Sequence, residues 1–187
     1  GLRPASVDAK RARFAAAASA LAARTGEARI DVAFFVPGRI EVLGKHTDYA
    51  GGRSLIAAAE RGFCVAARPR DDDRIVMTDA GRGSTFAARL DPDLVVPPSG
   101  WKNYGMTVVR RVARDFPHAR RGADIALASD LPSASGMSSS SAMMIAVTAI
   151  VSETRASTSP SASAASGARR RSCINAIAWT STPTLPI

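Results

Sequence analysis

Three segments of the chain have the hydrophobic pattern of helices. Residues 7–24 form an Ala-rich run that stops just before a glycine, and residues 142–151 form a continuous apolar run. Between 101 and 116 apolar residues recur at spacings of three and four, which predicts a helix with one apolar stripe that ends at Pro117. The residues of this predicted stripe are Met106, Val109, Val112 and Phe116.

Shorter apolar runs lie between these segments and predict β-strands. The expected strands are 30–36, 40–43, 55–67, 74–78, 85–90 and 123–128. The dipeptide Pro37-Gly38 predicts a break between the first two strands, and the residues at 60–62 predict an interruption in the third. The pair 74–78 and 85–90 flanks a glycine-containing turn and therefore predicts a hairpin.

The character of the sequence changes after Ser152. Residues 152–187 are rich in Ser, Thr, Ala, Pro and Arg, they show no apolar period, and Glu153 is their only acidic residue. This composition predicts a low-complexity tail after one domain at 1–151. The tail is either a genuine short ending or the product of a frameshift near Thr154, and we expect the frameshift because the apolar helix stops within one or two residues.

Composition and charge narrow the function classes. The chain has 187 residues, 46% of them hydrophobic, and a formal net charge of +9. The basic residues are scattered and no RNA-binding aromatic motif accompanies them, so a solvated basic surface is preferred over a nucleic-acid interface. Of the two cysteines, Cys64 lies in an apolar run and is expected to be buried. No secretion signal or membrane-spanning run is evident, which predicts a cytoplasmic protein without membrane partners.

A Ser- and Gly-rich segment at 131–142, here called the phosphate loop, lies between an expected strand and an expected helix. The first N–H groups of a helix lack intrahelical partners and carry partial positive charge, and small residues allow a phosphate to approach them closely. The Gly-Lys-Ser/Thr ending of a Walker A motif is absent. From the pattern alone, phosphate binding and a flexible Ser-rich linker remain alternatives.

The segment 37–52, here called the sugar loop, combines turn-forming residues with His46 and Asp48. A sugar is held by donors and acceptors fixed in a pocket, and a carboxylate can accept from two neighbouring hydroxyls. An isolated His-x-Asp pair is more often a polar turn with a surface histidine, so the pair alone does not decide between the two.

The phosphate loop resembles the Pro-x-Gly-x-Gly-Leu-Ser-Ser-Ser-Ala motif of GHMP kinases, which wraps the phosphates of ATP. Ala134, Met137 and Ser141 depart from that motif. The resemblance implies ATP and Mg²⁺ as cofactors, with Ser139 at the metal. The positions that it assigns to nucleotide binding are Pro132, Ala134, Gly136, Ser138, Ser139 and Ser140.

The sugar loop resembles the galactokinase signature Gly-Arg-Val-Asn-Leu-Ile-Gly-Glu-His-Thr-Asp-Tyr-Asn-Gly-Gly over its full length. The resemblance implies that Arg39 lies near the transferred phosphoryl group, as a catalytic residue, and that His46 and Asp48 bind sugar hydroxyls. Lys45 stands where the family has a sugar-binding glutamate. An ammonium group cannot accept a hydroxyl proton, so Lys45 predicts selection of an acidic sugar or of another hydroxyl pattern.

Together the two resemblances, which run from about 32 to 151, imply an α+β fold, the N-terminal domain of the GHMP kinase fold, with a mixed sheet and helices on one face. They imply a truncated galactokinase-like sugar kinase whose partners are a sugar and ATP. The family's base, an Asp beyond the phosphate-loop helix, and its C-terminal domain have no counterpart in the sequence, so these residues are expected to be inactive alone. A non-catalytic sugar- or nucleotide-binding remnant is the alternative, and a nucleic-acid-binding protein is a weaker third. The sequence does not indicate an oligomeric state.

Overall fold

The computed structural model describes residues 4–44, 47, 50–118, 121–132 and 136–156, and all structural statements below concern these residues. The helices are α1 (Pro4–Thr25), α2 (Trp101–Asp115) and α3 (Ser139–Ala156). The strands are β1 (Val32–Leu43), β2 (Leu55–Pro69), β3 (Arg74–Asp79), β4 (Ser84–Arg89) and β5 (Ala123–Ser129). The predicted tail lies outside the described residues from 157 onward. Helix α3 itself continues to Ala156, past the domain end expected at 151.

The five strands form one mixed sheet in the order β1-β2-β5-β3-β4. Strand β5 lies in the middle, antiparallel to β2 and parallel to β3, while β1–β2 and β3–β4 are antiparallel hairpins. Ile125 illustrates the arrangement, because it pairs with Ala67 on one side and with Met77 on the other. The mixed sheet and the α+β class agree with the sequence-based expectation, and so does the hairpin after residue 73.

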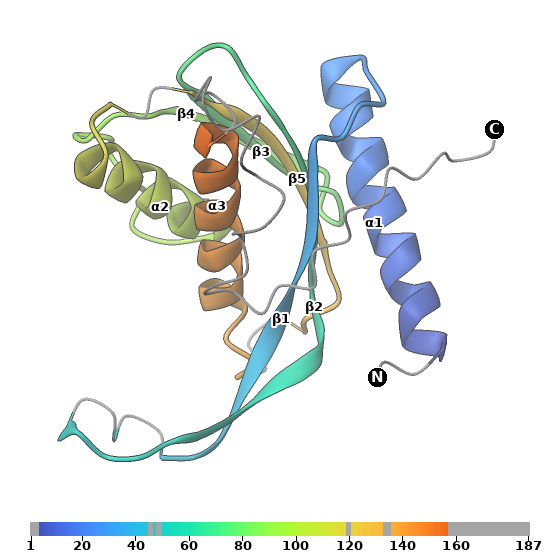
Figure 1. Cartoon of the computed structure of the whole chain (residues 1–187), viewed down its shortest axis with the longest axis vertical. Coiled ribbons are helices and arrows are strands. Elements are labelled where there is room, and N and C mark those ends of the chain that lie inside the picture. Colours follow the sequence, from blue (N-terminus) through green and yellow to red (C-terminus); the bar gives the residue numbers. More distant parts are fainter. Residues whose placement is uncertain (1–3, 45–46, 48–49, 119–120, 133–135, 157–187) are drawn as a thin grey trace, which may run out of the picture.

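Helices cover both faces of the sheet, which corrects the expectation that they lie on one face. Figure 1 shows α2 and α3 on one side of the sheet and α1 on the other. Alternate residues of a strand point to opposite faces. Strands β2 and β5 therefore each contribute side chains to two hydrophobic clusters, one on either face of the sheet. Val65 and Leu127 pack toward the α2–α3 side, and Ala66 and Ala126 pack toward α1 with Leu21. Small residues on the second face allow α1 to approach the sheet closely.

The apolar stripe of α2 is confirmed in part. Val109 and Val112 are buried in the main core, and Met106 is packed against it, whereas Phe116 is 50% exposed. The reason is that the helix ends at Asp115, and Phe116 already has the extended backbone of the C-terminal cap. Trp101 at the start of α2 packs against Phe86 of β4, with ring centroids 5.5 Å apart.

The predicted break at Pro37-Gly38 and the interruption at 60–62 are both wrong, because β1 and β2 run through these positions. The residue pairing shifts there: Pro37 pairs with Gly62 and Arg39 with Ala58, so that β2 has three residues opposite Gly38. This irregularity is a β-bulge. Proline has no N–H for the strand pairing and glycine has no side chain to pack, so both residues are found at bulges and in edge strands.

Beyond the bulge, the β1–β2 hairpin extends away from the rest of the domain (Figure 1). Its apolar side chains are largely exposed, although other strands of the sheet bury theirs. The exposed large apolar residues of this arm are Ile40, Val42, Leu43, Leu55 and Ile56. No helix of the described residues has both the length and the apolar character needed to cross a membrane.

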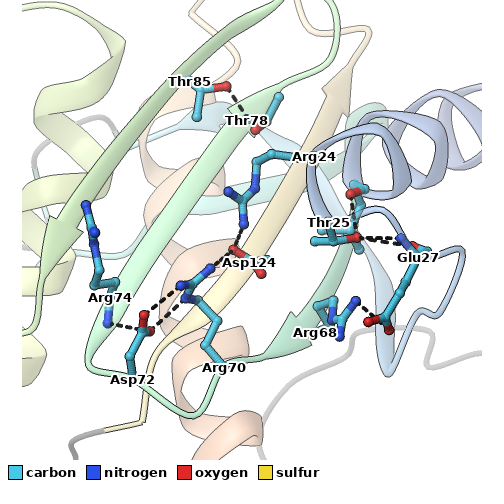
Figure 2. A network of polar contacts seen from close by, with 11 residues as sticks. Arg24, Thr25, Glu27, Arg68, Arg70, Asp72, Arg74, Thr78, Thr85 and Asp124 are labelled. Atoms are coloured by element: carbon cyan, nitrogen blue, oxygen red, sulfur yellow. Dashed lines mark hydrogen bonds and ion pairs between the residues drawn. The ribbon is translucent and has the colours of Figure 1, made fainter.

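An ion-pair network joins the end of α1 to the sheet, as Figure 2 shows. The buried carboxylate of Asp124 on β5 accepts from Arg24 of α1 and, at 2.9 Å, from Arg70. Arg70 also pairs with Asp72 at 2.6 Å. Burial, followed by the nearby charges of Arg70 and Arg68, lowers the pKa of Arg24. The guanidinium of Arg70 lowers the pKa of Asp72 to about 2.

The Asp72 pairing predicts a small pH-dependent contribution to stability. A carboxyl whose pKa is depressed on folding stabilises the protein above its unfolded value of about 3.9, and that stability is lost as the pH falls toward its folded value. Because Asp72 is 41% exposed, we expect Asp72→Asn to lower the free energy of unfolding by less than about 1 kcal/mol at pH 7.

Urea unfolding between pH 7 and pH 2 measures this difference. It should shrink below pH 4 and be mostly lost by pH 2. Asp93→Asn, at an exposed carboxylate 4.0 Å from Arg114, serves as the control and should change little at any pH. A difference that persists at pH 2 would mean that the carboxylate charge is not its cause.

Candidate functional site

The phosphate loop leaves the end of β5 and enters the N-terminus of α3. Helix α3 begins at Ser139, and the Ala142 N–H donates to the Ser138 carbonyl oxygen at 3.0 Å, which closes the first turn. Ser139 and Ser140 therefore belong to the helix. Gly136 and Ser138 both have left-handed backbone, with φ of 71° and 52°. Two such residues in close succession turn the chain sharply into the helix.

The environment of this turn suits an anion. The side chains of Ser138, Ser139 and Ser140 are half-buried at the helix N-terminus, where hydroxyl and backbone donors meet the positive end of the helix dipole. Gly136 is exposed, and a Cβ built on it would meet no atom of the described residues within 4 Å. Among these residues nothing blocks the approach of a phosphate to the Gly136 backbone. Pro132, at the loop entrance, is exposed as well.

Arg39 lies beside this loop. Its backbone N–H, on β1, donates to the Met137 carbonyl oxygen at 3.1 Å. Its side chain is 50% exposed and lies 3.6 Å from the Glu41 carboxylate. The start of the sugar loop and the end of the phosphate loop are therefore hydrogen-bonded neighbours, although about a hundred residues separate them in the sequence.

Gly38 makes the close approach of the two loops possible. It is buried, and a Cβ added there would lie 2.6 Å from the Leu131 side chain and 3.1 Å from the Met137 carbonyl oxygen. Both of those residues belong to the phosphate loop. A side chain at position 38 would require the Leu131 side chain and the Met137 carbonyl to shift.

The stem of the phosphate loop is fixed to the bulge in β2. Asp130 accepts the Gly62 N–H at 2.7 Å, and the Ser129 hydroxyl donates to the Gly62 carbonyl oxygen at 3.1 Å. The other carboxylate oxygen of Asp130 lies 3.7 Å from Arg13 of α1. On the same face, the buried Lys10 donates to the Glu60 carbonyl oxygen and lies 4.2 Å from the centre of the Phe35 ring.

The described part of the sugar loop is closed by Thr47. Its hydroxyl group bonds the carbonyl oxygens of Gly44 and Arg53, at 2.7 Å and 3.0 Å, and its own carbonyl accepts from Gly52 at 2.8 Å. These bonds bring the two ends of the loop together. Lys45, His46 and Asp48, together with Ala134 of the phosphate loop, lie outside the described residues, so their assigned roles stay predictions.

Cys64 is buried and free, as the sequence predicted. Burial raises the pKa of its thiol to about 11, so it is protonated at neutral pH and has no nucleophilic character. In the parts of the chain that the structure describes, no three His, Cys, Asp or Glu residues are placed to hold a metal ion.

Sequence reasoning missed the residues that join the two loops. The sequence marks Gly38 only as the first residue of the signature and as a strand break. Gly62 and Asp130 carry no motif of their own, and Arg13 lies in what reads as an ordinary Ala-rich helix. The one available signal was the pair of irregularities at 37–38 and 60–62. Each irregularity taken alone indicates a break in its own strand. Two irregularities at matching positions of neighbouring strands also indicate a β-bulge.

Comparison with known families gives two separate matches. Residues 20–69 match the galactokinase galactose-binding signature. Residues 103–169 match the N-terminal domain of GHMP kinases. The first segment contains the whole sugar loop, and the second contains the whole phosphate loop. Of the sugar loop, only Gly38 and Arg39 contact the phosphate loop. The described residues between β1 and β2 lie at the far end of the arm that extends away from the rest of the domain (Figure 1).

Curated relatives are galactokinases. That of Actinobacillus succinogenes is 35% identical over 114 residues, which are 60% of this chain and 30% of that protein. That of Chloroflexus aggregans is 43% identical over 114 residues, which are 59% of this chain and 28% of that protein. The chain therefore matches less than a third of the length of these relatives.

Among solved structures, the Lactococcus lactis galactokinase complexed with galactose is similar in both fold and sequence. It superposes with a TM-score of 0.68 and 25% identity, over 79% of this chain and 38% of that one. Sequence motifs, family matches, relatives and fold agree with one another. The chain belongs to the GHMP kinase superfamily and corresponds to the N-terminal part of its galactokinase-like branch.

Proposed function

We propose that this chain provides the nucleotide-binding and sugar-binding loops of an ATP-dependent sugar kinase. The reaction is transfer of the γ-phosphoryl group of ATP to a sugar hydroxyl. The observation that carries the proposal is the bond from the Arg39 N–H to the Met137 carbonyl oxygen, with Gly38 packed against the same loop. A kinase must hold both substrates with their reacting atoms nearly in contact. The contact of Gly38 and Arg39 with the phosphate loop supports the proposal because it brings the start of the sugar loop to the expected phosphate site.

Each loop has a distinct role in this proposal. Gly136 and the N–H groups at the start of α3 would bind the nucleotide phosphates, with Ser138 and Ser140 as further donors. Mg²⁺ would neutralise phosphate charge, and the Ser139 hydroxyl would bind it, as the family resemblance implies. The guanidinium of Arg39 is half-exposed and 3.6 Å from Glu41, and the backbone of the same residue contacts the phosphate loop. In the proposal it would stabilise negative charge on the transferred group.

His46 and Asp48 would bind the sugar hydroxyls. The partners of the chain are accordingly a sugar and ATP, with no nucleic acid or membrane involved, and the proposed location is the cytoplasm. A non-catalytic remnant that binds a sugar or a nucleotide is the second candidate. The match to only about 30% of the relatives' length favours it for these residues acting alone.

Nucleotide binding tests the proposal directly. We expect the chain to bind MgATP in a calorimetric or fluorescence titration, and Gly136→Ala to weaken binding about fivefold or more. An alanine side chain is strained at a φ of 71°, so the loop would move away from its present backbone. Gly83→Ala, at a φ of 63° in the β3–β4 turn, is the matched control and should leave affinity unchanged. Absence of MgATP binding by the folded wild-type chain would refute the proposal.

Lys45 provides a test of substrate class. In a full-length protein, made by joining this chain to the remaining part of a galactokinase relative, Lys45→Glu should shift kcat/KM toward neutral, galactose-like hexoses. The reason is that glutamate restores an acceptor for sugar hydroxyls. Steady-state kinetics over a panel of neutral and acidic sugars measures the change, with Lys102→Glu as the control for charge alone. An unchanged preference would place Lys45 away from the sugar.

A further inference from the structure

Three groups from three elements meet at the stem of the phosphate loop. We call Arg13, Gly62 and Asp130 the stem latch. Asp130 follows β5 directly, Gly62 lies in the bulge of β2, and Arg13 lies on α1. The Asp130 carboxylate accepts the Gly62 N–H at 2.7 Å with one oxygen and lies 3.7 Å from Arg13 with the other.

The stem latch lies where it can fix the position of the phosphate loop. The loop is held at two points: at its entrance by Asp130 on Gly62, and near its exit by the Arg39 N–H on the Met137 carbonyl oxygen. Both points lie where the β1–β2 pairing shifts, since Pro37 pairs with Gly62 and Arg39 pairs with Ala58. One bulge therefore sets the position of both ends of the loop.

The hydrogen bond between Asp130 and Gly62 is largely shielded from water, so breaking it has a measurable cost. The side chain of Asp130 is only 15% exposed, so the bond to the Gly62 N–H is largely protected from water. The Ser129 hydroxyl bonds the carbonyl oxygen of the same glycine, and the Leu131 N–H donates to that hydroxyl at 3.1 Å. Gly62 leaves no room for a side chain, because an added Cβ would lie 2.2 Å from the Val36 carbonyl oxygen.

We propose that Asp130 is a positioning residue that holds the phosphate loop beside Arg39, by binding the Gly62 amide while Arg13 of α1 restrains its second oxygen. Helix α1 begins before the segment that matches the galactose-binding signature at residues 20–69. The latch thus gives this helix a part in arranging the site. The identity of the ligand rests on the proposed function, whereas the positioning of the loop does not.

The experiment uses the whole chain with two measurements. The first is amide hydrogen exchange at Gly62 and at Arg39, referred to a core amide such as that of Leu127. The second is the affinity for MgATP. The variants are Asp130→Ala, Asp130→Asn and Arg13→Gln. Asp72→Ala is the matched control, since Asp72 also accepts from a backbone N–H, that of Arg74, and from an arginine, Arg70, but belongs to another loop.

We expect Asp130→Ala to speed exchange at both Gly62 and Arg39, and to weaken MgATP binding, each about tenfold. Asp130→Asn keeps an oxygen acceptor for the Gly62 N–H, so its exchange rates and its affinity should stay within about threefold of wild type. A general loss of stability would not explain such a difference between the two Asp130 variants. Arg13→Gln should fall between the two. Asp72→Ala should leave the Arg39 amide and the affinity unchanged.

Faster exchange at Gly62 alone, with Arg39 and the affinity unchanged, would overturn the proposal, and so would equal losses in Asp130→Ala and Asp130→Asn. If Asp130→Ala does not fold, the Arg39 amide in Arg13→Gln decides between the same outcomes. If the wild-type chain does not bind MgATP, the proposed function fails. The exchange measurements then still determine whether the latch positions the loop.

Discussion

A protein of these 187 residues alone should phosphorylate sugars at no more than about 0.1 per second, against about 10 per second for an ordinary enzyme. The first reason is chemical. General base catalysis contributes a factor of about 100 to 10,000, and no acidic residue follows Glu153 to act as the family's base. The second reason is spatial: the relatives are matched over about 30% of their length, so most of the protein that encloses their site is not supplied here.

The assay measures ADP release from MgATP with a panel of sugars, galactose among them. The Lactococcus lactis galactokinase serves as the positive control, and the MgATP titration shows that the chain is folded. Turnover within tenfold of 10 per second would contradict the prediction. It would mean that these residues contain a base not recognised here, or that a second copy of the chain completes the site.

Gly62→Ala should reduce the free energy of unfolding by about 3 kcal/mol or more, which corresponds to a fall in Tm of about 6–12 °C. An added Cβ would lie 2.2 Å from the Val36 carbonyl oxygen and 2.7 Å from the Phe35 ring. The backbone oxygen cannot move without separating β1 from β2, since the neighbouring Pro37 is the pairing partner of Gly62. The same shift would displace the N–H that Asp130 accepts.

Thermal and urea unfolding measure this loss. Gly81→Ala is the control, because a Cβ there makes only an ordinary contact, 3.4 Å from Asp79, and its φ is not positive. That substitution should change stability by about 0.5 kcal/mol or less. If Gly62→Ala is no worse than Gly81→Ala, β1 and β2 are not packed as closely as described.

Local patterns were enough to predict most elements of the fold. The stripe of α2 and the apolar run of β5 identify these elements because their own residues determine which face is buried. The break predicted at Pro37-Gly38 was wrong for a physical reason. Proline lacks the N–H that a strand pair uses, and glycine tolerates backbone angles that other residues avoid, so both suit a turn and a bulge alike. Only the neighbouring strand decides between the two.

The parts of the site that form a sequence motif could be predicted from the sequence. The sugar loop and the phosphate loop could be named from the sequence. The contact of the start of the sugar loop with the phosphate loop, through the bond between Arg39 and Met137, could not. The contact of Asp130 with Gly62 spans 68 residues, and nothing in either residue's local sequence specifies the other. Contacts of this kind follow from the topology of the sheet, which periodicity does not encode.

The central place of β5 has a consequence for how the chain folds as it is synthesised. The hairpins β1–β2 and β3–β4 are joined in the sheet only through β5, with Ile125 paired to both Ala67 and Met77. At about 5–20 residues per second, the ribosome needs roughly 3–10 s to add the 50 residues between Asp79 and Ser129. During that interval β2 and β3 each have an open inner edge, and isolated hairpins are only marginally stable. The nascent chain therefore depends on protection of these two edges until its last strand arrives.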